Sequence, residues 1–113
     1  MNSYRITGAK DSNGKASNYF ISDGKFVNEG ELASGAKDID AKGLTLLPGF
    51  VDLHTHLREP GREDAETVLT ASMAAASGGF TAISAMPNTL PVADTAGVVE
   101  QVYRLGKHHG VCD

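Results

Sequence analysis

The sequence predicts an α/β fold in two parts, a β-rich segment followed by alternating strands and helices. Short β-prone runs separated by turn residues fill residues 1–48. Beyond them, in residues 49–113, apolar runs of strand length alternate with longer runs at helical spacing. The resulting order, β-α-β-α, is typical of a parallel sheet covered by helices.

The first part, residues 1–48, is predicted to form several short strands. DSNGK at 11–15 is a turn cluster, and the β-prone run NYFIS at 18–22 is joined by DGK at 23–25 to another strand, as in a hairpin. Strands at this spacing favour the N-terminal part of a small β-sandwich. Taken alone, this segment points to no function.

The first βα unit begins with GFVDL at 49–53, an apolar run expected to form a buried strand. The run EDAETVLTASMAAASGG at 63–79 predicts a helix with Asp64 as its N-cap, Glu66 in its first turn and a glycine pair at its end. Its apolar stripe is expected to comprise Ala65, Leu69, Met73 and Ala76.

The second βα unit follows directly. FTAISAM at 80–86 predicts another buried strand, and Asp94 or Thr95 is expected to cap a helix that ends near Gly110. VCD at 111–113 is expected to begin a third strand. The apolar side of this helix is expected to carry Val98, Val99, Val102 and Leu105.

These units predict the beginning of a TIM-like barrel. A parallel sheet needs both faces covered, and a barrel of eight βα units takes about 250 residues. The chain has 113 residues, so we expect a truncated barrel, the front of a longer enzyme.

Composition excludes several classes of partner. The net charge is −4 and no Lys/Arg cluster is present, which argues against nucleic acid as a partner.

Cys112 is the only cysteine, so no internal disulfide is expected and a reducing compartment is favoured. The N-terminus lacks the apolar region of a secretion signal, and no run approaches the ~18 apolar residues of a membrane span. We expect a cytoplasmic homo-oligomer that acts on a small molecule.

His54 and His56 lie where the first strand of the second part is expected to end. Residues i and i+2 of a strand point to the same face, so the two imidazoles could coordinate one metal ion, with zinc the favoured metal. Asp52, one step deeper, could accept a hydrogen bond from a histidine and fix its tautomer. The alternative is a polar rim without metal, and two ligands alone do not complete a zinc site.

Arg58 and Asn88 are expected at the same rim. The Arg58 guanidinium could hold a substrate carboxylate with two parallel hydrogen bonds, or could pair with Glu59 or Glu63 at the surface. Asn88 could bind a carboxylate or carbonyl, although asparagine after proline is also ordinary turn chemistry.

Two histidines near the end of the second helix and the single cysteine are not expected to take part in the chemistry. His108 and His109 fall on or just after the second helix, on the outside of the expected barrel, and are interpreted as solvated surface residues. Cys112 is interpreted as a small core residue rather than a nucleophile.

The motifs PGFVDLHTHLREPG and AAASGGFTAISAMPNTLPVAD, at this separation, closely resemble those of dihydroorotases of the longer bacterial type, within the amidohydrolase superfamily. The resemblance covers nearly the whole chain. It implies a zinc-dependent enzyme that reversibly hydrolyses the cyclic amide of L-dihydroorotate to N-carbamoyl-L-aspartate in pyrimidine biosynthesis. Residues 1–48 would then start the accessory sandwich, and residues 49–113 would be the first two βα units of the barrel.

The resemblance also implies roles for individual residues. His54 and His56 match the first two zinc ligands, and His56, Arg58 and Asn88 match residues at the substrate. The general base and the remaining ligands are expected beyond Asp113, so no catalytic base is assigned in this segment and the chain alone is expected to be inactive.

Two other functions stay open at this point. Another cyclic-amide hydrolase, such as a dihydropyrimidinase or an allantoinase, would share the histidine pair but usually lacks an arginine at the position of Arg58. A non-catalytic, dihydroorotase-like scaffold would fit a protein of only 113 residues.

Overall fold

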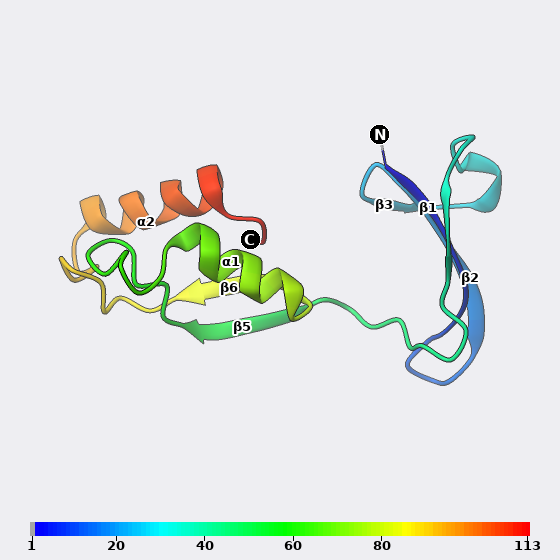
Figure 1. The fold of residues 1–113 in the computed structure, drawn as a ribbon, viewed down its shortest axis with the longest axis horizontal. Helices are drawn as coiled ribbons and strands as arrows, with labels where there is room; N and C mark the ends of the chain where they lie inside the picture. Colours follow the sequence, from blue (N-terminus) through cyan, green and yellow to red (C-terminus); the bar gives the residue numbers. More distant parts are fainter. Residues whose placement is uncertain (1) are drawn as a thin grey trace. The chain divides into compact units, whose positions relative to one another are not determined.

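The structure is a computed structural model and describes residues 2–113 (Figure 1). The chain forms two compact units, one ending at Pro48 and the other beginning at Gly49. None of the helices in residues 2–113 combines the length and apolar character needed to cross a membrane.

The N-terminal unit is one four-stranded sheet with the strand order β3-β2-β1-β4. Its elements are β1 (Ser3–Lys10), β2 (Ala16–Ser22), β3 (Lys25–Val27), the 3-10 helix η1 (Glu29–Glu31) and β4 (Lys37–Asp40). Strand β1 is antiparallel to β2 and parallel to β4. The predicted hairpin joins β2 to β3 through Asp23 and Gly24, whose φ angles of 51° and 74° suit a two-residue turn.

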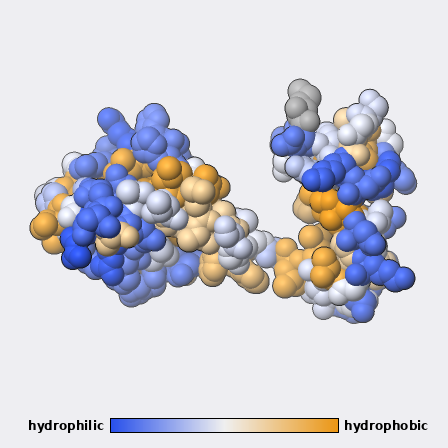
Figure 2. Space-filling view, in the orientation of Figure 1, coloured by the Kyte–Doolittle hydropathy of each residue, from blue (hydrophilic) through white to orange (hydrophobic). Residues whose placement is uncertain are grey.

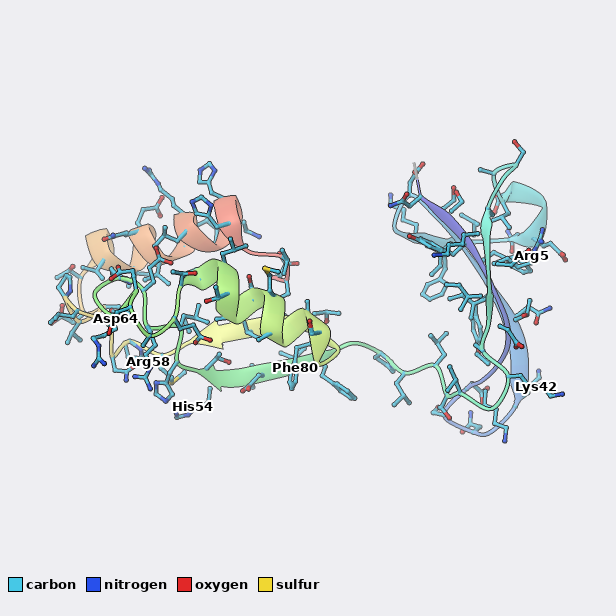
Figure 3. All side chains as sticks on the ribbon, viewed as in Figure 1. Arg5, Lys42, His54, Arg58, Asp64 and Phe80 are labelled. Carbon is cyan, nitrogen blue, oxygen red and sulfur yellow. The ribbon has the colours of Figure 1, made fainter. Side chains whose placement is uncertain are left out.

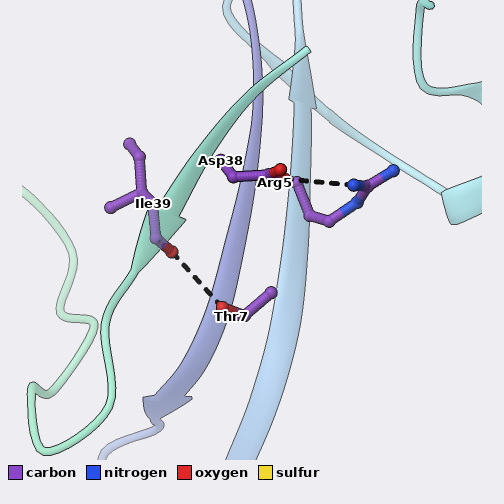
Figure 4. Close-up of polar contacts among 4 residues, drawn as sticks. All are labelled: Arg5, Thr7, Asp38 and Ile39. Carbon is purple, nitrogen blue, oxygen red and sulfur yellow. Dashed lines mark hydrogen bonds and ion pairs between the residues drawn. The ribbon is translucent and has the colours of Figure 1, made fainter. Parts of the chain in front are cut away.

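Two side-chain contacts join β4 to β1 at the edge of this sheet, in addition to the backbone pairing. Arg5 donates to Asp38 at 3.0 Å, and the Thr7 hydroxyl donates to the Ile39 carbonyl at 3.5 Å (Figure 4). Both contacts are exposed, so each contributes little to stability. Residues 2–48 form this single sheet, so the structure shows no second layer of a sandwich among the described residues and the sandwich stays a prediction.

The second unit has the predicted β-α-β-α order. Its elements are β5 (Phe50–Thr55), α1 (Val68–Ser77), β6 (Phe80–Ala85) and α2 (Ala96–His109). Strands β5 and β6 are parallel, α1 packs against β6, and α2 packs against α1 (Figure 1). A small core forms between these layers from Leu57, Val68 and Ala71, with Ile83, Ala85 and Leu105 packed against it.

Helix α1 starts later than predicted. Its N-cap is Thr67, whose hydroxyl accepts a hydrogen bond from Thr70 N at 3.2 Å. Asp64, the expected cap, lies in a preceding turn and pairs with Arg62 at 3.6 Å. Glu66 also lies before the helix, since the N-cap residue Thr67 follows it. The prediction was wrong because Thr67 is extended, with φ −106° and ψ 164°, and this conformation separates the turn around Asp64 from the helix.

The predicted apolar stripe of α1 was also wrong. Leu69 and Met73 are 42% and 53% exposed, whereas Val68, Ala71 and Ser72 are buried. The helix carries small or apolar residues on every side, so spacing alone does not select a face. In α2 the expected side is half-buried at Val98, Val102 and Leu105, but Val99 is 52% exposed.

The last residues contact β6 without forming a full strand. Asp113 N donates to the Thr81 carbonyl at 3.0 Å, and Ile83 N donates to the Asp113 carbonyl at 2.7 Å. Two such hydrogen bonds from one residue to both sides of its partner are the pattern of parallel strands. Asp113 thus pairs with β6 as the first residue of the expected third strand would. The Asp113 carboxylate also accepts a hydrogen bond from Lys107 at 3.0 Å and raises the pKa of that lysine.

Several large apolar side chains of this unit are exposed. Phe50, Val51 and Leu53 of β5 are 50%, 58% and 75% exposed, and apolar areas are visible on the surface (Figure 2). Cys112 is a half-buried free thiol, with its sulfur 3.9 Å from the Ser72 carbonyl oxygen.

Candidate functional site

The candidate site lies at the carboxyl ends of β5 and β6. Because the two strands are parallel, the loops that follow them meet at one edge of the sheet. His54 lies near the end of β5, Arg58 follows in the next loop, and Asn88 follows β6. Figure 3 shows His54 and Arg58 at one end of this unit and Phe80, the first residue of β6, at the other.

The structure brings the two histidines together. Strand β5 continues through Thr55, and the ring centroids of His54 and His56 are 5.2 Å apart. His54 is exposed and His56 is half-buried. The two imidazoles are therefore neighbours that solvent can reach, as the i, i+2 spacing predicts.

Asn88 contacts His56 directly. The side-chain oxygen of Asn88 lies 2.9 Å from Nδ1 of His56. An amide oxygen can only accept, so Nδ1 carries the proton and the lone pair of the neutral ring lies on Nε2. The NH₂ group of Asn88 keeps two donors for another ligand. No local sequence pattern predicts this contact, because the two residues are 32 positions apart.

Asp52 acts on the backbone rather than on a ring. Its carboxylate accepts a hydrogen bond from the backbone N–H of His54 at 2.9 Å. The expectation that Asp52 bonds to a histidine ring is therefore not met: the side chain that contacts a histidine ring is Asn88.

Arg58 adopts an unusual backbone conformation. Its φ is +62°, and the residues on either side are joined by a hydrogen bond from Glu59 N to the Leu57 carbonyl at 2.8 Å. This is a γ-turn with positive central φ, the rarer and more strained of the two γ-turn types. A non-glycine residue held there costs about 1–3 kcal/mol, and such strain clusters at functional sites.

The acidic residues near Arg58 have other partners. Glu59 accepts a hydrogen bond from Val68 N at 2.7 Å, and Glu63 accepts one from Gly61 N at 2.8 Å. Among residues 2–113, no ion pair or side-chain hydrogen bond involves the exposed Arg58 guanidinium. The structure therefore disfavours the surface ion pair that was the alternative role.

The loop after β5 and the loop after β6 are held together by backbone contacts. Leu90 N donates to the Pro60 carbonyl at 3.0 Å, and Pro60 is buried. Gly61, with φ +104°, packs so closely on Leu90 that an added Cβ would collide with the Leu90 carbonyl oxygen. The rim is therefore preformed by backbone contacts, which suits a site that must hold its ligands in fixed positions.

We expect Gly61→Ala to destabilise the protein more than Gly14→Ala. Both glycines have positive φ, but a Cβ on Gly14 would meet nothing within 4 Å. The backbone penalty of about 1–2 kcal/mol is common to both, and overpacking adds about 1–3 kcal/mol at Gly61 alone. Urea unfolding of the two variants tests this, and equal losses would show that the loops are not tightly clamped.

The donor set fits part of a zinc site. Imidazole nitrogens suit zinc, and a catalytic zinc takes three protein ligands and a water. Within residues 2–113, no group of three or more His, Cys, Asp or Glu side chains is placed to hold a metal. His108 and His109 lie in the last turn of α2 and form no such group with His54 and His56.

Comparisons with known proteins agree on one family. The profile of the dihydro-orotase-like family matches residues 43–107. A dihydroorotase of Streptomyces coelicolor is 58% identical over 116 aligned residues, which cover 100% of this chain and 27% of that protein. A dihydroorotase of Leifsonia xyli is 56% identical, covering 93% of this chain and 24% of that protein.

A solved structure shares the fold. L-Hydantoinase (dihydropyrimidinase) from Arthrobacter aurescens matches with a TM-score of 0.80 and 24% identity, over 100% of this chain and 27% of that one. The chain thus spans about a quarter of the length of the curated relatives it matches. Since the profile covers more than half of the chain, the protein belongs to the dihydro-orotase-like family.

Proposed function

We propose that this chain forms the first part of a dihydroorotase, a cytoplasmic enzyme of pyrimidine biosynthesis that reversibly hydrolyses L-dihydroorotate to N-carbamoyl-L-aspartate. One observation carries the proposal. At the carboxyl ends of β5 and β6, the two adjacent imidazoles lie at the same edge as the exposed Arg58. The acidic neighbours of Arg58, Glu59 and Glu63, accept hydrogen bonds from other groups. The dihydroorotases to which the chain is similar support it.

The imidazoles of His54 and His56 would hold a zinc ion, with His56 binding through Nε2 because Asn88 occupies Nδ1. Zinc bound there would act as a Lewis acid toward the ring amide. The remaining ligands and the general base would come from residues outside this chain.

The rim would select an acidic substrate. The Arg58 guanidinium presents paired donors that match a carboxylate. The NH₂ of Asn88, which has no hydrogen-bond partner among residues 2–113, supplies further donors at the same edge. His56 would contact the same substrate from the metal side. A ring without the carboxylate would leave these donors unused.

The direct test is hydrolysis by an enzyme of the relatives' length that carries this segment. Dihydroorotate, dihydrouracil and hydantoin are compared as substrates. We expect dihydroorotate to have by far the highest kcat/KM. A preference for hydantoin or dihydrouracil would assign another cyclic-amide hydrolase, and inactivity on all three would favour a scaffold. Light scattering of the same enzyme tests the proposed homo-oligomer.

Asn88→Asp should separate the two roles of Asn88. The aspartate keeps an oxygen that can accept from Nδ1 of His56, but it places a negative charge where the substrate carboxylate would bind. We expect zinc content to stay near wild type while KM for dihydroorotate rises about tenfold or more. Metal analysis and steady-state kinetics check this. Lost zinc with an unchanged KM would mean that Asn88 serves the metal site alone.

A further inference from the structure

We propose that Glu59 is a positioning residue that presents Arg58 to the substrate. The inference rests on the proposed function, in which Arg58 binds the substrate carboxylate, and it adds a residue that does not itself touch substrate. It comes from the hydrogen bonds on either side of the Arg58 turn.

Glu59 ties the loop to the start of α1. Its carboxylate accepts a hydrogen bond from Val68 N, the first residue of the helix, at 2.7 Å, in a partly buried contact across nine positions of sequence. The ordinary N-cap, Thr67, serves a different donor, Thr70 N. A carboxylate at a helix N-terminus is favoured by the helix dipole and satisfies a backbone donor that would otherwise lack a partner.

This anchor fixes both neighbours of Arg58. On one side Leu57 is 7% exposed and belongs to the core. On the other side the Glu59 side chain is bonded to α1, and the Glu59 backbone N–H closes the γ-turn on the Leu57 carbonyl. The turn that gives Arg58 its positive φ is thus held between two fixed residues.

The same contact keeps the guanidinium available. Glu59 is the acid adjacent to Arg58 in sequence, and an unbonded carboxylate there would compete with a substrate for the arginine. Its bond to Val68 N directs that charge toward the helix instead. Glu59 therefore acts twice, by shaping the turn and by directing the charge adjacent to Arg58 in sequence toward the helix.

The test uses the full-length enzyme and two rings, dihydroorotate and dihydrouracil. We expect Glu59→Ala to lower kcat/KM for dihydroorotate on the order of tenfold, mainly through KM, and to leave dihydrouracil unchanged. Glu59→Gln, which keeps an acceptor for Val68 N, should restore most of the loss. Thr67→Ala is the matched control, since it weakens the same helix start without touching the Arg58 turn; it should lower thermal stability but not the ratio between rings.

A double-mutant cycle separates positioning from a general structural role. If Glu59 acts through Arg58, Glu59→Ala combined with Arg58→Met should be no worse on dihydroorotate than Arg58→Met alone. Additive losses, or equal losses on both rings, would overturn the inference. A selective loss in Arg58→Met with none in Glu59→Ala would overturn it while sparing the proposed function. No selective loss in Arg58→Met would overturn both.

Discussion

Replacing His54 or His56 with alanine is expected to abolish ring hydrolysis and to lower the zinc content of the full-length enzyme. Each change would remove one of the two adjacent imidazoles at the end of β5, and no third potential ligand among residues 2–113 is placed to substitute. Loss of a ligand from a catalytic zinc site removes the Lewis acid on which the hydrolysis depends.

The matched controls are His108→Ala and His109→Ala, which remove exposed imidazoles from the end of α2. These variants should keep wild-type zinc and activity. Metal analysis of the purified proteins decides the matter. Wild-type zinc stoichiometry in both the His54 and His56 variants would remove the ligand assignment.

Replacing Arg58 with methionine should lower kcat/KM for dihydroorotate selectively. Losing a hydrogen bond to a charged group costs about 1.5–3 kcal/mol, a factor on the order of ten to a hundred. Dihydrouracil has the same ring without the carboxylate and should lose nothing. Arg58→Lys should also be poorly tolerated, because lysine keeps the charge but lacks the paired donors.

Arg62→Met provides the comparison for this experiment. Arg62 is exposed in the same loop but pairs with Asp64 at 3.6 Å, so its loss should affect neither ring. Steady-state kinetics of both variants on both rings gives the result. Equal losses on both rings in Arg58→Met would mean that Arg58 supports the fold or the metal site, and the choice of dihydroorotate would lose its physical basis.

Sequence periodicity was sufficient for the order of the elements but not for the start of α1. The second helix was placed correctly because Thr95 and Gly110 bound a run with one clearly polar side. For α1, Asp64 resembled an N-cap, yet the structure uses Thr67 and the distant Glu59. The cap from Thr67 to Thr70 N is local, but the hydrogen bond from Val68 N to Glu59 links separate segments and leaves no local signal in the sequence.

The same limit explains what was missed at the site. The pairing of His54 with His56 is local, and the period of a strand predicts it. The contact between His56 and Asn88 joins residues 32 positions apart. It follows from the parallel pairing of β5 and β6, so the topology could have suggested that the two loops meet, although not which atoms bond. The role of Asp52 was misjudged because its side chain bends back to its own strand.

Zinc-edge anomalous diffraction from crystals of the full-length enzyme with dihydroorotate would test the site most directly. We expect an anomalous peak about 2.0–2.1 Å from Nε2 of His56 and from an imidazole nitrogen of His54. The ring carboxylate should lie against the Arg58 guanidinium, with the NH₂ of Asn88 beside it. Zinc bound away from this pair, or a carboxylate bound away from Arg58, would contradict the proposed site.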